Sequence, residues 1–226
     1  MRRAVSGEIL LLRSLLPTAT SDLSPEAVGS WIVLPGERNS GCTLPGEIPF
    51  RPPHGPFDLA LSLFHYEGKV REGIQAAKYR GRSNVARTLA RRLFSVIRED
   101  WADRFPVGFR PTIVPVPIRP EKYFRRGYNF PALVGLFLAR LTGWSCDPLL
   151  LRRTRERRPQ AGLPLSAREG NVRRSFTVRP GVRVPPHVLL VDDVYTSGAT
   201  VAACARALKK AGAEHIVVLT VARALL

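Results

Sequence analysis

The stretch VLLVDDVYTSGATVAACARALKKA, residues 188–211, decides the fold. It begins with an unbroken apolar run at 188–191, which is typical of a strand covered on both faces in a parallel α/β sheet. Asp192 and Asp193 end this run. Because a buried carboxylate without a partner is costly in free energy, we expect both at the carboxyl end of the strand, where open α/β sheets bind ligands.

A short turn rich in small and hydroxyl-bearing residues follows the two acids. It consists of Thr196, Ser197, Gly198, Ala199 and Thr200. Backbone N–H groups at the start of a helix, with three hydroxyls beside them, form a favourable site for a phosphate group. The turn is therefore a candidate phosphate site.

A helix and a second strand complete the unit. Apolar residues recur at helical spacing at Val201, Cys204, Ala205 and Leu208. Lys209 and Lys210 occupy the predicted last turn, and Gly212 provides a stop. The apolar run 216–221 then predicts another strand, so the sequence predicts a β-loop-α-β unit.

Acids at a strand end, followed by a phosphate site, match a ligand with vicinal hydroxyls at one end and a phosphate at the other. A ribose 5-phosphate is such a ligand. The alternative is an ordinary strand-turn-helix with a solvated Asp pair and hydroxyls that only cap the helix. The pair Asp192 and Asp193 alone favours that alternative, whereas the whole pattern favours the ligand site.

Four apolar residues, two acids and then TSGAT closely resemble the 5-phosphoribosyl 1-pyrophosphate (PRPP) signature of type I phosphoribosyltransferases. The resemblance implies an α/β fold with a twisted, mainly parallel sheet flanked by helices. It also implies that Asp192 and Asp193 hold the ribose 2- and 3-hydroxyls, that residues 196–200 wrap the 5-phosphate, and that Mg²⁺ binds with PRPP at the two acids. In an active enzyme these acids would be the catalytic residues and would favour the ribosyl cation.

Size and composition limit the functional classes. With 226 residues, 45% of them hydrophobic, the chain can form one α/β domain with a small appendage. Its formal net charge of +17 indicates an anionic partner. Only five of the 35 basic residues are Lys, however, so coding composition is an alternative origin of the Arg excess.

Cysteine usage and the first residues indicate the compartment. Cys42, Cys146 and Cys204 lie far apart without a C-x-x-C pair, which excludes a cysteine-rich zinc ribbon, so we expect no zinc. Glu8 and Arg13 interrupt the apolar start of the chain, which argues against a signal peptide. No apolar run approaches the ~20 residues of a spanning helix. We therefore predict a cytoplasmic protein without a transmembrane segment.

The first part of the chain divides near residue 57. Residues 1–57 contain many prolines and glycines and are predicted to form a small irregular appendage, with the phosphoribosyltransferase-like domain at 58–226. A strand, a short helix and a longer helix at 84–97 are predicted to open the domain. Their apolar positions are Leu59, Leu61 and Leu63, then Val70, Ile74 and Ala77, then Val85, Leu89, Leu93 and Val96.

A second informative stretch is TIVPVPIRPEKYFRRGYNFPALVGLFLARLTG, residues 112–143. It predicts a buried strand at 112–114, which Pro115 and Pro117 stop, then a loop and a helix at 132–141. The loop contains Arg119, Lys122, Arg125, Arg126 and Gly127. In the resembling enzymes the loop at this place faces the pyrophosphate, and these cations suit a polyphosphate. A basic surface loop without a ligand is the alternative.

The segment that precedes the acid motif is strongly basic. We predict a third strand at 147–151 and, after it, a mobile loop at 152–183 with ten Arg and two Glu. In the resembling enzymes a flexible loop in this position closes over the substrate and excludes water. A dense Arg loop equally suits a nucleic-acid backbone, so both interpretations stay open.

Several spacings narrow the resemblance to the ComF family of competence and DNA-utilisation proteins. The matching features are PVP at 115–117, RRGYN at 125–129, RRPQAGL at 157–163, Arg168, Asn171 and Phe176. This resemblance implies single-stranded DNA as a partner during transformation, a helicase as a possible second partner, and contacts from Arg157, Arg158, Gln160, Arg168 and Asn171. Two departures are the missing four-cysteine zinc ribbon, of which only Cys42 is retained, and Phe130 in place of the usual Gln.

Three functions compete at this stage. The first is a competence-type protein that binds PRPP or a phosphoribosyl group together with single-stranded DNA. The second is an active phosphoribosyltransferase with an unidentified base or amine as acceptor, and the third is a PRPP-sensing regulator. A complete glutamine amidophosphoribosyltransferase is excluded, because the chain begins Met1-Arg2-Arg3 and has no room for a glutaminase domain. An oligomer is compatible with all three.

Overall fold

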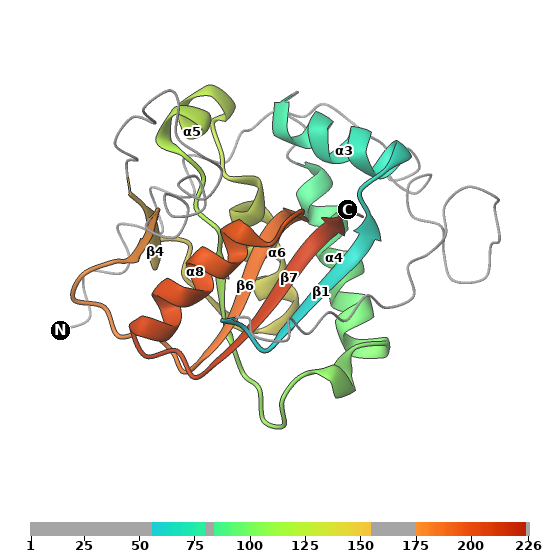
Figure 1. The fold of residues 1–226 in the computed structure, drawn as a ribbon. Helices are drawn as coiled ribbons and strands as arrows, with labels where there is room; N and C mark the ends of the chain where they lie inside the picture. The colour runs from blue at the N-terminus through green and yellow to red at the C-terminus, as the bar shows by residue number, and fades with distance from the viewer. Residues whose placement is uncertain (1–55, 80–83, 155–174, 225–226) are drawn as a thin grey trace.

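The computed structural model describes residues 56–79, 84–154 and 175–224, which form an α/β fold (Figure 1). The strands of the central sheet are β1 (Leu59–His65), β2 (Thr112–Pro115), β3 (Ser145–Cys146), β6 (His187–Tyr195) and β7 (His215–Arg223). They are all parallel and lie in the order β1-β7-β6-β2-β3. The predicted α/β class with a parallel sheet is confirmed.

Helices cover both faces of this sheet. They are α3 (Gly68–Tyr79), α4 (Asn84–Glu99), α5 (Pro120–Arg126), α6 (Phe130–Thr142) and α8 (Ala199–Lys210), with the 3₁₀ turn η1 at Ala102–Arg104. One face shares its hydrophobic core with α3, α4 and α6, and the other face shares its core with α8. Figure 1 shows α8 in front of the sheet and α6 behind it.

The apolar run of β6 is unbroken because both faces of this strand are buried. Leu189 and Val191 point into the core beneath α4 and α6, whereas Val188 and Leu190 point into the core beneath α8. Since both faces are covered, every position of the run must be apolar. The predicted strand β1 is confirmed: residues 59–64 are all buried, and Leu59, Leu61 and Leu63 share the core of one face. Its one polar member in this range, Ser62, shares a hydrogen bond of 2.6 Å with Thr220.

The predicted helices also agree with the structure. The apolar positions predicted for α3 and α4 are buried. α6 extends the predicted helix by two residues at its start and one at its end, and α8 ends at Lys210, in the predicted last turn. Gly212 has a φ of +107° just after α8, consistent with its predicted role as a stop.

The prediction of a third strand at 147–151 is wrong. The sheet strand is the earlier β3, and it ends at Cys146. Asp147 then starts a turn in which its Oδ1 accepts a hydrogen bond of 2.9 Å from the N–H of Leu149. An Asp side chain that bonds the backbone two residues later competes with strand pairing, and Pro148 provides no donor at all.

The basic segment at 152–183 is not a single loop. Its beginning belongs to β4 (Leu151–Arg153) and its end contains β5 (Phe176–Val178), which pair antiparallel as a separate two-stranded sheet. Phe176 is buried in the core that α8 shares, so it ties this small sheet to the domain. The middle of the segment and residues 1–55 of the appendage predicted at 1–57 lie outside the described residues.

The loop predicted after β2 contains a helix. Pro120 occupies the first turn of α5, and Gly127 ends the helix with a φ of +77° while its N–H donates to the carbonyl of Tyr123. Proline at the start and glycine just past the end are a recognised helix signature, which the prediction overlooked. A Cβ at position 127 would meet no atom within 4 Å, so crowding does not require glycine there. The left-handed φ does, because other residues adopt it only with strain.

The order of the strands creates a switch point between β2 and β6. From β2 the chain passes through α6 to β3 on one side, whereas from β6 it passes through α8 to β7 on the other. Because α6 and α8 lie on opposite faces, the two connections diverge at the carboxyl ends of β2 and β6. Open α/β sheets bind ligands at such a crevice.

Candidate ligand site at the carboxyl ends of β2 and β6

The two acids lie where β2 leaves the sheet. The pairing of β2 with β6 ends at Pro115 opposite Val191, and the N–H of Val116 donates the last bond of 2.8 Å to the carbonyl of Val191. Asp192 is the next residue of β6 and pairs only with Thr220 of β7. One edge of β6 is thus unpaired by β2 from Asp192 onward, although β6 itself continues beyond the predicted strand end to Tyr195, paired with β7.

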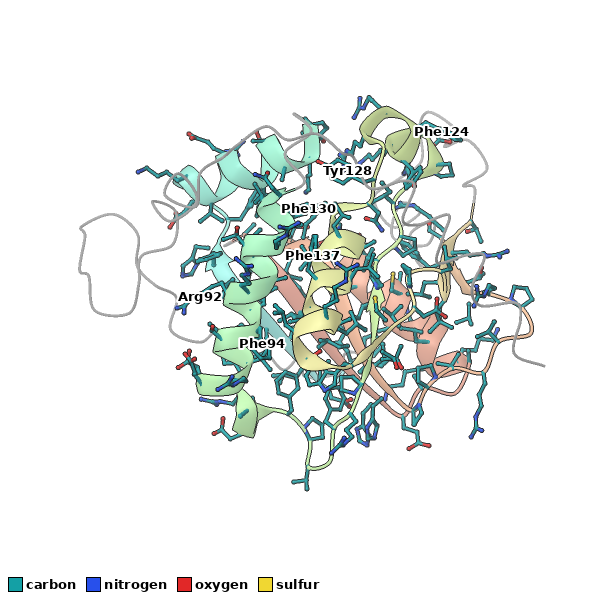
Figure 2. All side chains as sticks on the ribbon, turned by 180° about the vertical axis from the view of Figure 1, so that it is seen from behind. Arg92, Phe94, Phe124, Tyr128, Phe130 and Phe137 are labelled. Atoms are coloured by element: carbon teal, nitrogen blue, oxygen red, sulfur yellow. The ribbon has the colours of Figure 1, made fainter. Side chains whose placement is uncertain are left out.

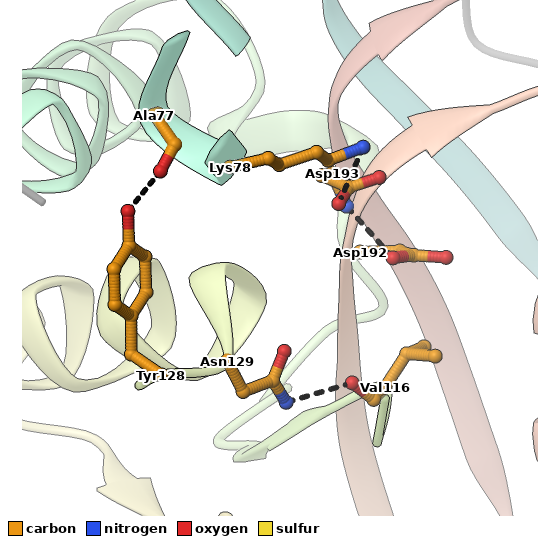
Figure 3. A network of polar contacts seen from close by, with 7 residues as sticks. All are labelled: Ala77, Lys78, Val116, Tyr128, Asn129, Asp192 and Asp193. Carbon is orange, nitrogen blue, oxygen red and sulfur yellow. Dashed lines mark hydrogen bonds and ion pairs between the residues drawn. The ribbon is translucent and has the colours of Figure 1, made fainter. Parts of the chain in front are cut away.

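The acid pair is held by two short contacts, drawn in Figure 3. The N–H of Asp193 donates to Oδ1 of Asp192 at 2.8 Å. The ammonium of Lys78 lies 2.8 Å from Oδ2 of Asp193, and both of these side chains are only 15% exposed. Such a half-buried ion pair fixes the direction of the Asp193 carboxylate.

Burial raises the pKa of Asp192 to about 8, and repulsion from Asp193 adds to the rise. The hydrogen bond from the N–H of Asp193 and the charge of Lys78 act in the opposite direction but do not cancel it. The raised pKa favours the protonated form of Asp192 in the unliganded protein. A ligand group that donates hydrogen bonds or carries positive charge would relieve this unfavourable burial.

The last turn of α3 contacts several segments around the acid pair. The carbonyl of Ala77 accepts a hydrogen bond from the hydroxyl of Tyr128, Lys78 pairs with Asp193, and the ring of Tyr79 lies against α5. Three consecutive residues thus contact three different elements. Lys78 was not among the predicted site residues. The predicted helix placed Ile74 and Ala77 inward, but nothing in the sequence pattern connected the neighbouring Lys with an acid more than a hundred positions away.

Asn129 is a second residue that the predicted site did not include. Its Nδ2 donates to the carbonyl of Val116 at 3.0 Å, which fixes the orientation of the amide. Its Oδ1 is buried and accepts no hydrogen bond from the residues that the structure describes. In Figure 3 this oxygen points toward the side on which Asp192 and Asp193 lie. A buried acceptor without a donor indicates a place for a ligand hydroxyl or a water.

The turn after β6 is built around Gly198. This residue is the N-cap of α8 with a φ of +74°, and a Cβ there would lie 2.3 Å from the hydroxyl oxygen of Tyr195. The backbone of the turn therefore packs directly on the buried Tyr195 ring, which only glycine permits. The N–H of Ala199 lies 3.4 Å from Oγ of Ser197, a weak bond that a stronger acceptor such as a phosphate oxygen would outcompete.

The predicted cations lie on α5 and just before it. Arg119, Lys122 and Arg125 are exposed, and Arg126 is half-buried. Arg125 and Arg126 contact the ring of Tyr79 with their guanidinium carbons 5.6 and 4.5 Å from its centroid. Because Tyr79 follows Lys78, α5 is linked to the acid pair through α3.

The remaining predicted site residues are not described. Arg157, Arg158, Gln160, Arg168 and Asn171 all fall within 155–174. In the described ranges, no group of three or more His, Cys, Asp and Glu side chains could hold a metal ion. Two carboxylates and an unpartnered amide oxygen are nevertheless the hard oxygen donors that Mg²⁺ accepts when a ligand supplies the rest. The residues present therefore fit Mg²⁺ only together with a ligand.

A search of the helices within the described ranges finds none with both the length and the apolar character that crossing a membrane requires.

Two curated proteins illustrate what the chain is similar to. Competence protein F of Haemophilus influenzae is 32% identical over 173 residues, which cover 74% of each chain. The DNA utilization protein YhgH of Salmonella typhi is 31% identical over 176 residues, covering 77% of this chain and 75% of that protein. The chain thus spans about three quarters of the length of these relatives. No family model matches the chain.

A solved structure with a related arrangement is the glutamine PRPP amidotransferase from B. subtilis complexed with ADP and GMP. The alignment covers 62% of this chain and 26% of that one, with 21% identity and a TM-score of 0.37. At this TM-score the likeness carries no argument about function.

Proposed function

The chain belongs to the ComF family of competence and DNA-utilisation proteins, and we propose that it binds a phosphoribosyl group, either as PRPP or within a nucleic acid, at the carboxyl ends of β2 and β6. The single observation that carries this proposal is the placement of Asp192 and Asp193 at the switch point, directly before a glycine-dependent turn that starts a helix. Two acids followed by a turn at a helix start suit the vicinal hydroxyls and the phosphate of a ribose 5-phosphate.

Each part of the ligand has a suitable partner. The ribose hydroxyls would donate to Asp192 and Asp193, and Oδ1 of Asn129 is an acceptor that still lacks a donor among the described residues. The 5-phosphate would accept from the N–H groups at the start of α8, with help from the hydroxyls of the turn 196–200. Mg²⁺, bound together with PRPP and held by Asp192 and Asp193, would supply positive charge beside the ligand oxygens.

Nucleic acid is the second proposed partner. The net charge of +17 favours a polyanion, and relatives are named for competence and DNA utilization. We propose that the basic surface holds single-stranded DNA in the cytoplasm during DNA uptake, in cooperation with a helicase. If the binding is electrostatic, the logarithm of its affinity falls with the logarithm of salt concentration by about 0.7 per phosphate neutralised.

An active phosphoribosyltransferase is the alternative function. It is favoured by the cations of α5, which are joined to the acid pair through α3 and would stabilise a departing pyrophosphate. In that reaction the bond between C1 and the pyrophosphate oxygen breaks, and a base or amine forms the new bond to C1. Release of pyrophosphate from PRPP in the presence of one acceptor from a panel would identify this activity.

Calorimetric titration of the protein with PRPP and Mg²⁺ tests the first part of the proposal. We expect the double variant Asp192→Asn, Asp193→Asn to lose binding while it keeps a cooperative thermal transition. The matched control is Asp103→Asn, because Asp103 is an exposed acid whose side chain lies 3.8 Å from Arg104 and far along the chain from β6. If the double variant bound PRPP as the native protein does, the site would be wrong.

A further inference from the structure

The helix α5 has an unusual surface for an element of a folded domain. None of its seven residues is buried, although it contains an aromatic pair at Tyr123 and Phe124. Phe124 is 85% exposed, and Figure 2 shows its side chain at the outer edge of the molecule. A short helix is usually stabilised by an apolar face that packs on the core, which α5 lacks. This phenylalanine does not serve the stability of the domain.

Positive charge surrounds this ring. The α5 face, as we define it, comprises Tyr79, Arg119, Lys122, Phe124, Arg125 and Arg126. Tyr79 is itself 58% exposed, and two guanidinium groups lie within 6 Å of its ring centroid. The face thus combines two accessible aromatic rings with four cations, and the acid of α5, Glu121, lies in the first turn of the helix.

Another strongly exposed apolar residue provides a contrast. Val107 is fully exposed at 104%, in the segment that leads into the amino end of β2. It is aliphatic and has no π face, and scattered apolar residues of this kind are common on protein surfaces. The α5 face differs because its apolar groups are flat rings and its neighbours are cations.

We propose that the α5 face binds single-stranded nucleic acid. One base stacks on Phe124, the same nucleic-acid strand extends to Tyr79, and the cations bind the flanking phosphates. This inference rests on the nucleic-acid part of the proposed function and adds the place and the mode of binding. Aromatic rings stack on bases of any sequence, and cations along a helix follow a phosphate backbone. A duplex does not offer free base faces, so the partner is single-stranded.

The position of the face connects the strand to the acid pair. Tyr79 directly follows Lys78, whose ammonium lies 2.8 Å from Oδ2 of Asp193. A nucleic-acid strand that reaches Tyr79 on the α5 face would therefore contact the residue next to Lys78, which pairs with Asp193. The proposed nucleic-acid site at α5 and the proposed phosphoribosyl site at β6 are thus neighbours, connected through the last turn of α3.

Fluorescence anisotropy with a labelled oligothymidylate tests the proposal. We expect Phe124→Ala to weaken binding about 5- to 100-fold, the range that follows from the loss of one stacked base. The slope of affinity against salt should not change, because no charge is removed. The double variant Lys122→Gln, Arg125→Gln should instead lower that slope by about 0.7 for each phosphate that is no longer neutralised. Val107→Ala is the matched control and should bind as the native protein does.

An abasic oligonucleotide separates stacking from misfolding. On this strand the native protein and Phe124→Ala should bind with equal affinity, because the group that stacks is missing. Titration of Phe124→Ala with PRPP and Mg²⁺ should reproduce the native result, which shows that the fold is intact.

The outcomes that would overturn the proposal are distinct. If the native protein bound single strands and Phe124→Ala bound them equally well, the α5 face would be wrong while the proposed nucleic-acid function would stand. If the native protein bound no single strand even at low salt, both would fall, irrespective of the PRPP result. If Phe124→Ala left the affinity for single strands unchanged and lost only binding to anionic phospholipid vesicles, the partner of α5 would be a membrane surface, contrary to the proposal.

Discussion

The two ends of the sheet differ in what holds them together. At the amino end, aromatic rings pack against one another. The ring of Phe109 stacks on Phe105 and on His187 with centroid distances of 5.5 and 5.4 Å, and His187 contacts His215 edge to face at 5.4 Å. These contacts join three separate segments. The acid beside the stack, Asp58, has partners: its Oδ2 lies 3.6 Å from Nδ1 of His215 and accepts a hydrogen bond of 2.8 Å from the N–H of Ile216. The amino end is built for stability.

The carboxyl end contains groups that a purely structural end would avoid. Asp192 is buried beside Asp193, Oδ1 of Asn129 is buried without a donor among the described residues, and Gly198 is held in a left-handed conformation against Tyr195. The first two features lower the stability of the folded protein, and the third can be adopted without strain only by glycine. The difference is the one expected if packing determines the amino end and the proposed ligand site determines the carboxyl end.

Phe109→Ala should have the largest effect on stability and none on ligand binding. The ring is buried between Phe105 and His187, and truncation of a buried Phe costs about 3 kcal/mol. In a domain of this size that loss lowers Tm by about 6–12 °C. Differential scanning calorimetry measures the shift, and titration with PRPP below the transition should give the native affinity.

Val107→Ala is the control for this prediction. It removes a fully exposed side chain two residues away and should leave Tm unchanged. A loss of PRPP affinity in Phe109→Ala comparable to its loss of stability would mean that the two ends are coupled, and the comparison would fail.

The sequence predicted the central β-loop-α-β unit because its signals are local. The apolar run of β6, the acids and the turn follow one another within thirteen residues, and the resemblance rests on the same stretch. Helices with a clear apolar stripe were predicted for the same reason. These features do not depend on what the rest of the chain does.

The errors and omissions concern contacts between distant residues or overlooked end signals. Lys78 and Asp193 lie far apart in the chain, so their ion pair could only be found in three dimensions. The strand predicted at 147–151 was apolar enough for a strand, but the side chain of Asp147 bonds the backbone and starts a turn. The helix α5 was predictable from its proline and glycine, and its missing apolar stripe explains why it was taken for a loop.

Gly198→Ala should have a smaller effect on stability and a larger effect on binding. A Cβ at this position adds left-handed strain and overlaps the ring of Tyr195, which together cost about 2 kcal/mol. The turn must shift to relieve the overlap, so its N–H groups lose their alignment with a phosphate. We expect at least a tenfold loss of PRPP affinity by calorimetry, since displacement of a hydrogen-bonded charge costs about 1.4 kcal/mol or more.

Gly143→Ala separates the two causes. Gly143 has the same φ of +74° at the end of α6, but a Cβ there meets no atom within 4 Å. It should lose about 1 kcal/mol of stability and keep native affinity for PRPP. If Gly198→Ala resembled this control in both measurements, the contact with Tyr195 would not matter to the site.

Asp192→Asn should change stability least near pH 4, and its effect should grow as the pH rises. In the folded protein the pKa of Asp192 is raised to about 8, whereas in the unfolded chain it is about 4. Between these values unfolding releases a proton, so the stability that Asp192 contributes is complete below about pH 4 and is lost as the pH rises to about 8. The slope is at most about 1.4 kcal/mol per pH unit, and solvent contact of the half-buried side chain reduces it.

Urea unfolding of the native protein and of Asp192→Asn at a series of pH values isolates this contribution, because all other groups titrate in both proteins. Asn resembles the protonated acid and can still accept the hydrogen bond from the N–H of Asp193. The difference in free energy of unfolding should therefore move in favour of the variant as the pH rises, while the variant binds PRPP less well. A constant difference across this range would show that Asp192 is an ordinary ionised surface acid, and the carboxyl end of the sheet would then carry no destabilised group for a ligand to relieve.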